Sequence, residues 1–582
     1  MKLNAGTPIL LFILFLSTAC QKPQDLQKPN IILIMTDDQG WGDIRSHGNN
    51  LIDTPNLDAL AAAGTRFDRF YVSPVCAPTR ASLLTGRYDQ RTGVHGVTRT
   101  RETMREEEMT IAELLKKNGY ATGCFGKWHN GAHYPHSPNG QGFDEFFGFS
   151  AGHWNNYFDT TLEHNGELVQ TEGYVADVFT DAAIDFIEKN KSQPFFCYVP
   201  YNTPHSPFQA PDKYFDKYKA RGLDDLTASA YAMCENIDDN VGRILRKLDE
   251  TGLTENTIVI FLTDNGPNSD RFNGGMRGRK AHAHEGGVRV PFFIKWPGQI
   301  PAGKTVEKIA AHIDVLPTLA EITGSETPDN FLLDGKSLVP LIQGGDADWP
   351  DRTIFTQWQN RGGLRTQTHR LYVNDDGVSL FDMINDPGQK NDLSQNEVEL
   401  TRELKDAYDD WLVEVGEGEK SRIPTQIGHA ENPLVILPAH EAELHKDNGG
   451  GISYNDRWGW ANDWATNWTR ERAWLEWPVK FVASGEYEIL LEYACAPENA
   501  GARFSIEAGG EKLQTEIDQA FLQDQIPSPD RVPRGEVYEK TWGKHLAGKL
   551  KLPAGITALQ IRPLLKVGER LPDLKAVHIR KI

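Results

Sequence analysis

Four mainly apolar runs of five or six residues stand out along the chain, at residues 31–35, 120–125, 195–199 and 257–262. Such short runs are typical of parallel strands that are covered on both faces of a sheet. Segments with helical spacing lie between them, at residues 109–117, 175–189 and 227–250. The pattern predicts an α/β fold with a large, mostly parallel sheet, flanked by helices and joined by right-handed crossovers.

Each run leads into a polar cluster. The first and the last are near copies, Thr-Asp-Asp-Gln-Gly at residues 36–40 and Thr-Asp-Asn-Gly at residues 263–266. The other two are Gly-Lys-Trp-His at residues 126–129 and Thr-Pro-His-Ser-Pro at residues 203–207. In open α/β sheets ligands bind beyond the carboxyl ends of the strands, so we expect the four clusters to converge there.

The clusters hold residue types that suit cleavage of an anionic ester. Oxygen ligands of the kind that calcium takes, about 6–8 at a time, are offered by Asp37, Asp38, Asp264 and Asn265. Positive groups for a tetrahedral oxyanion are Arg80, Lys127 and Lys280, and groups that transfer protons near neutral pH are His129 and His205. The combination predicts a metal-assisted site for sulfuryl or phosphoryl transfer.

Each cluster also has a purely structural interpretation. Asp37 and Asp38 could form an Asx turn at a strand end, and Asp-Asn-Gly is a good turn sequence. His205 could be an ordinary loop residue, and Lys127 with His129 could be a solvated strand end. Because complementary residue types follow four different strands, we favour a common site.

The stretch at residues 73–87, Ser-Pro-Val-Cys-Ala-Pro-Thr-Arg-Ala-Ser-Leu-Leu-Thr-Gly-Arg, offers a nucleophile. The residues after Pro78 resemble the opening of a helix, which places Cys76 at a positive helix end where anions bind. The alternative is a small buried cysteine. Cys-x-Pro-x-Arg with a later Thr-Gly-Arg resembles the signature of the formylglycine-dependent sulfatases, in which this cysteine is oxidised to an aldehyde.

The order of motifs extends the resemblance from about residue 30 to residue 392. Asp-Asp, Cys-x-Pro-x-Arg, Gly-Lys-Trp-His, Pro-His-x-Pro, Asp-Asn-Gly and Lys with Glu-Gly-Gly-x-Arg-Val-Pro follow one another as in arylsulfatase-type members of the alkaline phosphatase superfamily. The resemblance implies an alkaline phosphatase-like fold. It also implies one calcium ion, bound by Asp37, Asp38, Asp264, Asn265 and the formylglycine made from Cys76 by a formylglycine-generating or sulfatase-maturating enzyme.

The same resemblance implies the catalytic roles. Arg80 and Lys127 would hold the formylglycine and the sulfate, and Lys280 would contact the sulfate and the leaving oxygen. One hydroxyl of the hydrated aldehyde would attack sulfur while His205 protonates the leaving oxygen. Deprotonation of the second hydroxyl, with His129 as the base, would then expel sulfate.

Sugar recognition is less defined by the sequence. A serine that sulfatases often place after Gly-Phe-Asp has no clear counterpart after residues 142–144. Candidates for a sugar subsite are His153 and Trp154 after that motif, and His282 and His284 after Lys280. The alternative for all four is packing within aromatic loops.

Composition narrows the class of protein. The 582 residues are 39% hydrophobic and carry a formal net charge of -20, which argues against nucleic acid as a partner. An acidic protein with an anionic substrate must concentrate positive charge locally. The six cysteines lack the paired spacings of a zinc site or a disulfide framework.

The first residues resemble an export signal. Lys2 precedes an apolar run at residues 8–16, which is shorter than the roughly 20 residues of a membrane span. Small residues before Cys20 resemble a bacterial lipoprotein box, so we expect lipidation of Cys20, with ordinary signal cleavage as the alternative. The predicted location is the periplasm or the outer-membrane surface.

Beyond about residue 422 the composition changes. Residues 423–438 resemble a linker, and six tryptophans crowd residues 458–477. Alternating strands are predicted at residues 485–493, 502–506, 546–552 and 558–561, with a terminal strand at 576–579, which favours a β-sandwich. The region resembles galactose-binding-type carbohydrate-binding modules; the alternative is a structural domain whose tryptophans form a core.

The expected organisation is a signal peptide at residues 1–20, a catalytic domain at 28–345, a small α+β subdomain at 346–425 and the β-sandwich at 426–582. The expected function is hydrolysis of sulfate esters in a sulfated polysaccharide or its oligosaccharides, with algal glycans such as ulvan as the candidate. Two alternatives stay open, a phosphonate or phosphate ester hydrolase on the same scaffold and a surface glycan-binding protein with an idle site.

Overall fold

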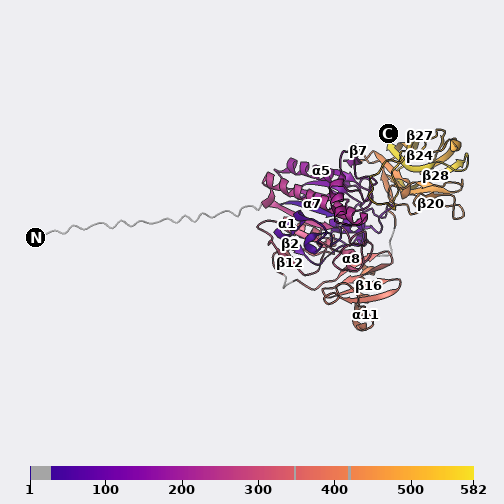
Figure 1. Cartoon of the computed structure of the whole chain (residues 1–582). Helices are drawn as coiled ribbons and strands as arrows, with labels where there is room; N and C mark the ends of the chain where they lie inside the picture. The colour runs from indigo at the N-terminus through magenta and orange to yellow at the C-terminus, as the bar shows by residue number, and fades with distance from the viewer. Residues whose placement is uncertain (2–27, 346–348, 417–420) are drawn as a thin grey trace.

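The computed structural model describes residue 1 and residues 28–345, 349–416 and 421–582. The predicted leader, the lipoprotein box and Cys20 lie outside these residues. Within them, no helix combines the length and the apolar character that crossing a bilayer requires. The body of the chain has a large α/β part, with a four-stranded sheet below it and a β-rich region at its upper right in Figure 1.

The α/β part is built on a ten-stranded sheet in the order β12-β2-β11-β9-β1-β8-β4-β5-β6-β7. Its centre, from β9 to β5, is parallel, whereas β11 pairs antiparallel with β9 and β6 with β5, so the whole sheet is mixed. In sheet order the strands are Lys304–Val306, Thr65–Phe67, Phe292–Lys295, Thr257–Thr263, Asn30–Thr36, Phe195–Pro200, Ala121–Lys127, Glu145–Phe149, Thr161–His164 and Glu167–Gln170. The four strands predicted from apolar runs are β1, β4, β8 and β9, and they are neighbours at the parallel centre.

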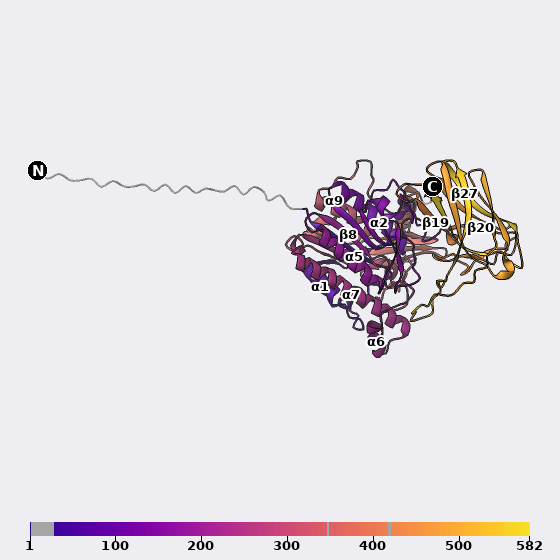
Figure 2. The same cartoon turned by 90° about the horizontal axis from the view of Figure 1, so that it is seen from above.

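Alternate side chains of β1 serve two separate cores, because successive residues of a strand point to opposite faces. Ile31, Leu33 and Met35 belong to the cluster that includes α2 and α9. Ile32 and Ile34 belong to the cluster that includes α1, α5 and α7. Figure 2 shows these two groups of helices on opposite sides of β8. The continuous apolar run in the sequence is therefore explained by burial of both faces.

Eleven α-helices are present among the described residues. They are α1 Pro55–Ala63, α2 Cys76–Thr85, α3 Asp89–Thr92, α4 Ile111–Lys117, α5 Val175–Asn190, α6 Asp212–Ala220, α7 Asp225–Thr251, α8 Glu285–Val288, α9 Val315–Thr323, α10 Val339–Ile342 and α11 Val398–Glu414. The three helices predicted from spacing correspond to α4, α5 and α7.

Two smaller sheets follow or flank the large one. Strands β10 Arg289–Val290, β3 Phe70–Tyr71 and β13 Ala310–Ala311 form a short three-stranded sheet. Four antiparallel strands, β14 Ile354–Trp358, β15 Arg361–Arg365, β16 His369–Asn374 and β17 Gly377–Asp382, pack against α11. The turn between β14 and β15 reaches the candidate site.

The remaining strands form two sheets that enclose one core, which we call the β-domain. One sheet contains β20 Glu443–His445, β18 Thr425–Ile427, β23 Trp474–Phe481, β28 Gly555–Leu565, β25 Ala502–Ala508 and β26 Glu511–Ile517. The other contains β19 Leu434–Pro438, β21 Ser453–Tyr454, β22 Ala465–Thr466, β29 Asp573–Lys581, β24 Gly485–Ala494 and β27 Gly543–Leu552.

The prediction of a linker at residues 423–438 was wrong. β18 pairs with β23 in one sheet of the β-domain, and β19 pairs with β29 in the other. The segment therefore connects the two sheets as part of the fold. Its short apolar stretches resemble a linker in sequence because the residues they pair with lie 54 positions (β18 with β23) and about 140 positions (β19 with β29) further along the chain.

Candidate functional site

The candidate site lies beyond the carboxyl ends of the parallel strands. Thr36 at the end of β1 pairs with Thr263 at the end of β9, so Asp37 and Asp264 follow at the same level of the sheet. Asp38 has a φ of 67°, in the left-handed region that aspartate tolerates better than most residues. Lys127 is the last residue of β4, which is separated from β1 by β8 alone. Strand register therefore brings together residues that are up to 227 positions apart.

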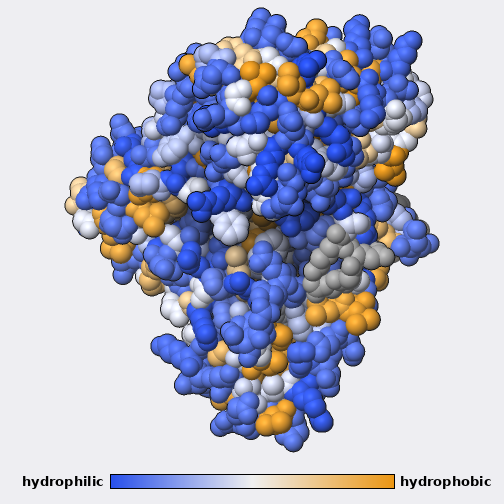
Figure 3. All heavy atoms as spheres, turned by 90° about the vertical axis from the view of Figure 1, so that its right-hand side faces the viewer, coloured by the Kyte–Doolittle hydropathy of each residue, from blue (hydrophilic) through white to orange (hydrophobic). Residues whose placement is uncertain are grey.

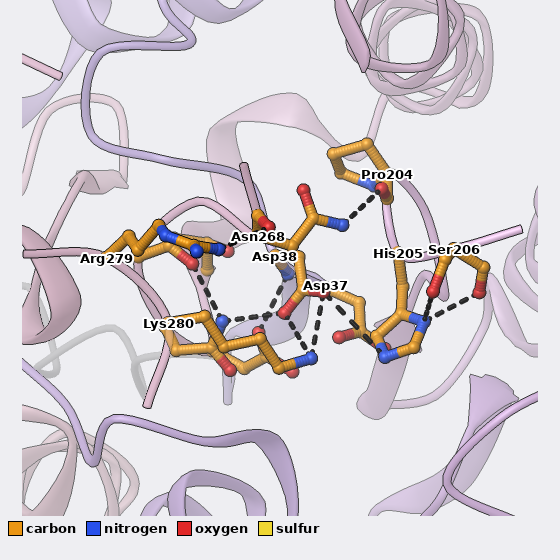
Figure 4. A network of polar contacts seen from close by, with 12 residues as sticks. Asp37, Asp38, Pro204, His205, Ser206, Asn268, Arg279 and Lys280 are labelled. Carbon is orange, nitrogen blue, oxygen red and sulfur yellow. Dashed lines mark hydrogen bonds and ion pairs between the residues drawn. The ribbon is translucent and has the colours of Figure 1, made fainter. Parts of the chain in front are cut away.

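Three carboxylates and three cations interlock at this end of the sheet. Asp37 Oδ2 accepts a hydrogen bond from Lys127 Nζ at 2.5 Å. Arg80 Nη2 lies 3.0 Å from Asp264 Oδ2 and 3.6 Å from Asp37 Oδ2. Lys280 Nζ lies 2.8 Å from Asp38 Oδ1, as Figure 4 also shows. All six side chains were predicted site residues, and the structure places them in one network.

Two oxygens of the network have no hydrogen-bond partner within the described part of the chain. They are Asp37 Oδ1 and Asn265 Oδ1, and both residues are fully buried. Burying an oxygen acceptor without a partner is costly, and a cation would satisfy both atoms. Ligand atoms of Asp37, Cys76 and Asp264 lie within 4.8 Å of one another. The residues present therefore fit a hard metal ion such as calcium.

The charges of the network perturb its carboxylates in opposite directions. Burial alone would raise the pKa of Asp37, but Lys127, His205 and Arg80 lower it well below its usual range. Burial and the neighbouring Asp37 charge raise the pKa of Asp264 to about 7. A divalent cation beside Asp264 would favour its ionised form, as any opposite charge does.

Cys76 is the first residue of α2, the position predicted from its sequence context. Its side chain is buried, and burial raises the pKa of its thiol. A thiol whose pKa is raised is a poor nucleophile at neutral pH, because the thiolate is the reactive form. Unmodified Cys76 is therefore badly suited to attack, although its position beside the carboxylates is suited to a nucleophile.

The two histidines of the site follow different strands, His129 after β4 and His205 after β8. His129 Nε2 is 3.0 Å from the carbonyl oxygen of Val97, whereas His129 Nδ1 is buried without a partner among the described residues. His205 Nδ1 is 2.7 Å from the carbonyl oxygen of Ser206, and its Nε2 is 3.7 Å from Asp38 Oδ2. In Figure 4 the His205 ring points toward Asp37 and Asp38.

These side chains open into a pocket of about 580 Å³. Cys76, His129, His205 and Lys280 line its inner part. The outer part is lined by Trp358, Gln359 and Arg361 at the β14–β15 turn and by Trp458, Trp460, Ala461, Gly535 and Glu536 of the β-domain. Figure 3 shows a largely hydrophilic face that is hollowed between its upper and lower parts.

Only one of the four predicted sugar-subsite residues lines this pocket. His153 does so, with its Nε2 3.0 Å from Asn155 Oδ1. Trp154 instead stacks on Phe149 with ring centroids 4.9 Å apart, and its indole nitrogen donates to Thr160.

The two later candidates also lie elsewhere. His284 stacks on Tyr372 with ring centroids 3.8 Å apart, and it bonds Gln389. His282 contacts the carbonyl oxygens of Arg279 and Lys280 and lines a separate hollow. Trp154 and His284 therefore pack within aromatic loops, which is the alternative that the sequence left open for them.

Sequence reasoning missed several residues of the pocket. Arg279 and Asn268 come from the loops after β9, and Ser206 directly follows His205. Glu536 comes from a segment of the β-domain and accepts a hydrogen bond from Ser206. Proximity to a known motif could have indicated the first three, whereas nothing in the local sequence indicates Glu536.

Comparison with known proteins gives consistent results. The family model described as sulfatase matches residues 29–325, and that for the C-terminal region of N-sulphoglucosamine sulphohydrolase matches residues 279–412. The arylsulfatase of Hemicentrotus pulcherrimus is 35% identical over 384 residues, which cover 60% of this chain and 67% of that protein. The N-acetylgalactosamine-6-sulfatase of Mus musculus is 30% identical over 469 residues, which cover 69% and 88%.

Among solved structures, Ps i-CgsB in complex with k-i-k-neocarrahexaose is 32% identical, with a TM-score of 0.64. The match covers 68% of this chain and 94% of that chain. Both family models end before residue 413, so the β-domain lies outside them.

Proposed function

The chain belongs to the sulfatase family, and from this premise we propose that it removes sulfate from a sulfated polysaccharide or its oligosaccharides. We further propose that Cys76 is converted to formylglycine, and that Asp37, Asp38, Asp264 and Asn265 hold one calcium ion together with it. The observation that supports both proposals is the pair of buried, unpartnered oxygens of Asp37 and Asn265 beside Cys76.

Calcium, when bound, withdraws charge from sulfate oxygens, and formylglycine supplies an attacking oxygen that a buried thiol does not. The positively charged side chains of the network hold neighbouring site residues in place. Arg80 joins Asp264 to the end of β4, since its Nη1 donates to the carbonyl oxygen of Lys127 at 2.7 Å. Arg80 and Lys127 have nearly no exposed surface, but the Lys280 side chain is 22% exposed. Of these three cations, Lys280 is therefore the one that can meet a sulfate oxygen at the pocket surface.

The hydrogen bonds of each histidine indicate which of its ring nitrogens carries a proton. A carbonyl oxygen only accepts hydrogen bonds, so His129 Nε2 carries the proton that contacts Val97, and Nδ1 has a free lone pair. Burial lowers the pKa of His129 well below its usual value and keeps it neutral. Nδ1 of the neutral ring therefore has a lone pair that can take a proton, as a base weaker than an ordinary histidine.

For His205, Nδ1 donates to the Ser206 carbonyl oxygen, so Nε2, 3.7 Å from Asp38 Oδ2, can pass a proton to a leaving oxygen only from the cationic ring. Together a neutral His129 and a cationic His205 offer a proton acceptor and a proton donor in the pocket that Cys76 also lines, as an ester transfer requires.

The substrate class is supported by relatives and by the pocket. Ps i-CgsB was solved with a carrageenan hexasaccharide, and the mouse relative is an N-acetylgalactosamine-6-sulfatase. A pocket of about 580 Å³ lies within the range of about 300–1,000 Å³ that encloses drug-sized ligands, so it can hold a sulfate with its sugar. We propose sulfated glycans of algal type, such as ulvan or carrageenan, as the first substrates to test.

The test combines two measurements on protein produced with a formylglycine-generating enzyme. Mass spectrometry of the tryptic peptide containing Cys76 is expected to show a loss of about 18 Da, the change from thiol to aldehyde. Release of inorganic sulfate is then measured with hexasaccharides from ulvan, carrageenan and chondroitin sulfate, and with 4-nitrophenyl sulfate beside 4-nitrophenyl phosphate.

We expect sulfate release that Cys76→Ala abolishes. A persistent thiol would overturn the formylglycine assignment. Faster phosphate than sulfate release would favour a phosphate or phosphonate esterase. Retention on immobilised glycan without any turnover would favour a binding protein.

Export and a lipid anchor at Cys20 are also proposals. They are supported only by the sequence of residues 1–20. Metabolic labelling with a radioactive fatty acid tests them, since Cys20→Ser should remove the label and release the protein from the membrane fraction.

A further inference from the structure

Two exposed tryptophans of the β-domain face the pocket that contains Cys76. Trp458 is 72% exposed and Trp460 is 45% exposed, and both line the pocket. Trp468 and Trp477, from the same crowded region of sequence, are at most 2% exposed and belong to the β-domain core, and Trp464, which is 3% exposed, packs against Trp542. The tryptophan cluster thus divides into a structural group and a pair without a packing role.

The pair is carried by a loop with a fixed backbone. The Asp456 carboxylate accepts hydrogen bonds from the backbone nitrogens of Trp458 at 2.8 Å and Gly459 at 2.7 Å. A third bond comes from the backbone nitrogen of Trp460 at 3.4 Å. An exposed indole on a rigid turn loses little conformational entropy when a ligand covers it.

The same loop is attached to the α/β part at three points. Arg99 donates to the carbonyl oxygen of Trp458, and Thr98 donates to that of Gly459. Asn462 Nδ2 donates to the carbonyl oxygen of His153 at 3.0 Å. His153 itself lines the pocket, so the loop position is coupled to the pocket wall.

A second segment of the β-domain closes another part of the rim. Glu536 accepts a hydrogen bond from Ser206, next to His205. Burial would raise the pKa of Glu536, but His153 and the Ser206 bond lower it to about 2, so it is ionised at neutral pH.

This second segment is also held firmly. Arg534 Nη1 donates to the carbonyl oxygen of Asn155 at 2.9 Å, and its Nε donates to Asp530 at 2.7 Å. An ionised carboxylate held at the rim can accept hydrogen bonds from sugar hydroxyls.

We propose that Trp458 and Trp460 form a platform for a sugar ring of the sulfated oligosaccharide, so that the β-domain is part of the substrate site. This inference rests on the proposed sulfatase function. Indole faces offer large apolar area to the C–H face of a sugar, and the opposite rim supplies polar partners. The β-domain then binds the same glycan chain that is desulfated, instead of binding glycan at a separate site.

The test uses the single variants Trp458→Ala and Trp460→Ala. Trp474→Ala serves as the matched control, because Trp474 lies on β23 of the same domain, stacked on His445 at 3.6 Å and away from the pocket. The substrates are the hexasaccharide that wild-type protein desulfates best and 4-nitrophenyl sulfate at saturation. KM and kcat are measured for each, with thermal unfolding as a check on folding.

We expect each pocket variant to raise KM for the hexasaccharide by about tenfold, the usual scale for truncating a tryptophan anchor at an interface. The kcat for 4-nitrophenyl sulfate should change by less than about twofold, and the control should change neither quantity. Unchanged KM in both pocket variants, or an equal loss on both substrates, would overturn the inference. Failure of the proposed function looks different, because wild-type protein would then release sulfate from neither substrate.

Discussion

Replacing Glu285 by glutamine should destabilise the part of the fold that carries Lys280. Glu285 opens α8, five residues after Lys280, and its side chain is 1% exposed. Its Oε2 lies 2.8 Å from Arg370 Nη2 and 3.6 Å from Arg365 Nε, and its Oε1 accepts a hydrogen bond from Tyr71 at 2.8 Å. Removal of the carboxylate charge leaves two buried guanidinium groups without their counter-charge.

The size of the effect follows from the pKa of Glu285. Burial alone would raise that pKa, but Arg370, Arg365 and Arg289 lower it from 4.5 to about 2. The two values differ by about 2.5, which corresponds to about 3 kcal/mol of stability. Loss of one partner of a buried ion pair generally costs about 3–5 kcal/mol, which agrees with this figure.

The direction of this pKa shift provides a second test, through the pH dependence of stability. Because the pKa is lower in the folded state, the ion pair contributes its full stability above pH of about 4.5 and loses it as the pH falls toward 2. The difference in free energy of unfolding between wild-type protein and Glu285→Gln should therefore be constant between pH 6 and 8, at about these values, and shrink in acid.

Urea unfolding at pH 7 measures the first effect, with an expected fall in midpoint of about 1 M. Glu250→Gln is the matched control, because the Glu250 side chain is 66% exposed at the end of α7 and should change the midpoint little. A loss below about 1 kcal/mol at pH 7, or one that grows in acid, would refute the reasoning.

Two further predictions concern the site itself. Calcium should raise the midpoint of thermal unfolding of wild-type protein, and Asn265→Ala should lose much of that rise because it removes a buried, unpartnered oxygen. Scanning fluorimetry with and without a chelator measures the midpoints. An equal rise in both proteins would contradict the metal assignment. Gly152→Ala should lower turnover by at least about tenfold, because the new Cβ would lie 2.2 Å from His129 Nε2. Steady-state kinetics with 4-nitrophenyl sulfate tests this against Gly450→Ala, where the nearest atom is 3.9 Å away, and similar rates would exclude a role for the His129 position.

The inner part of the site could be predicted because strand topology determines it. Asp37, Lys127 and Asp264 each lie at or directly after the end of an apolar run, and parallel pairing brings such ends together whatever the length of the connections. The sequence of each run was sufficient to predict a parallel strand whose end lies at this edge of the sheet. The α2 start at Cys76 was predictable in the same local way.

The outer part could not be predicted because loop packing determines it. His153 and Trp154 are neighbours in sequence, yet one lines the pocket and the other stacks on Phe149. Trp458 and Trp468 likewise belong to one tryptophan-rich stretch, and only tertiary contacts place the first at the pocket and the second in the core. Residue type and spacing are the same for both outcomes, so no local pattern separates them.

The charges of the network address how a chain with a formal net charge of -20 can act on an anionic ester. Its three cations, Arg80, Lys127 and Lys280, are paired with the carboxylates of Asp37, Asp38 and Asp264, so the six formal charges cancel. The side chains alone therefore attract a sulfate only weakly. A bound divalent cation would make the inner site positive, since its ligands are already neutralised by their own partners. Pairing each carboxylate with a fixed cation thus lets an acidic protein concentrate positive charge at one point, and it makes the affinity for sulfate depend on the metal more than on the overall charge of the chain.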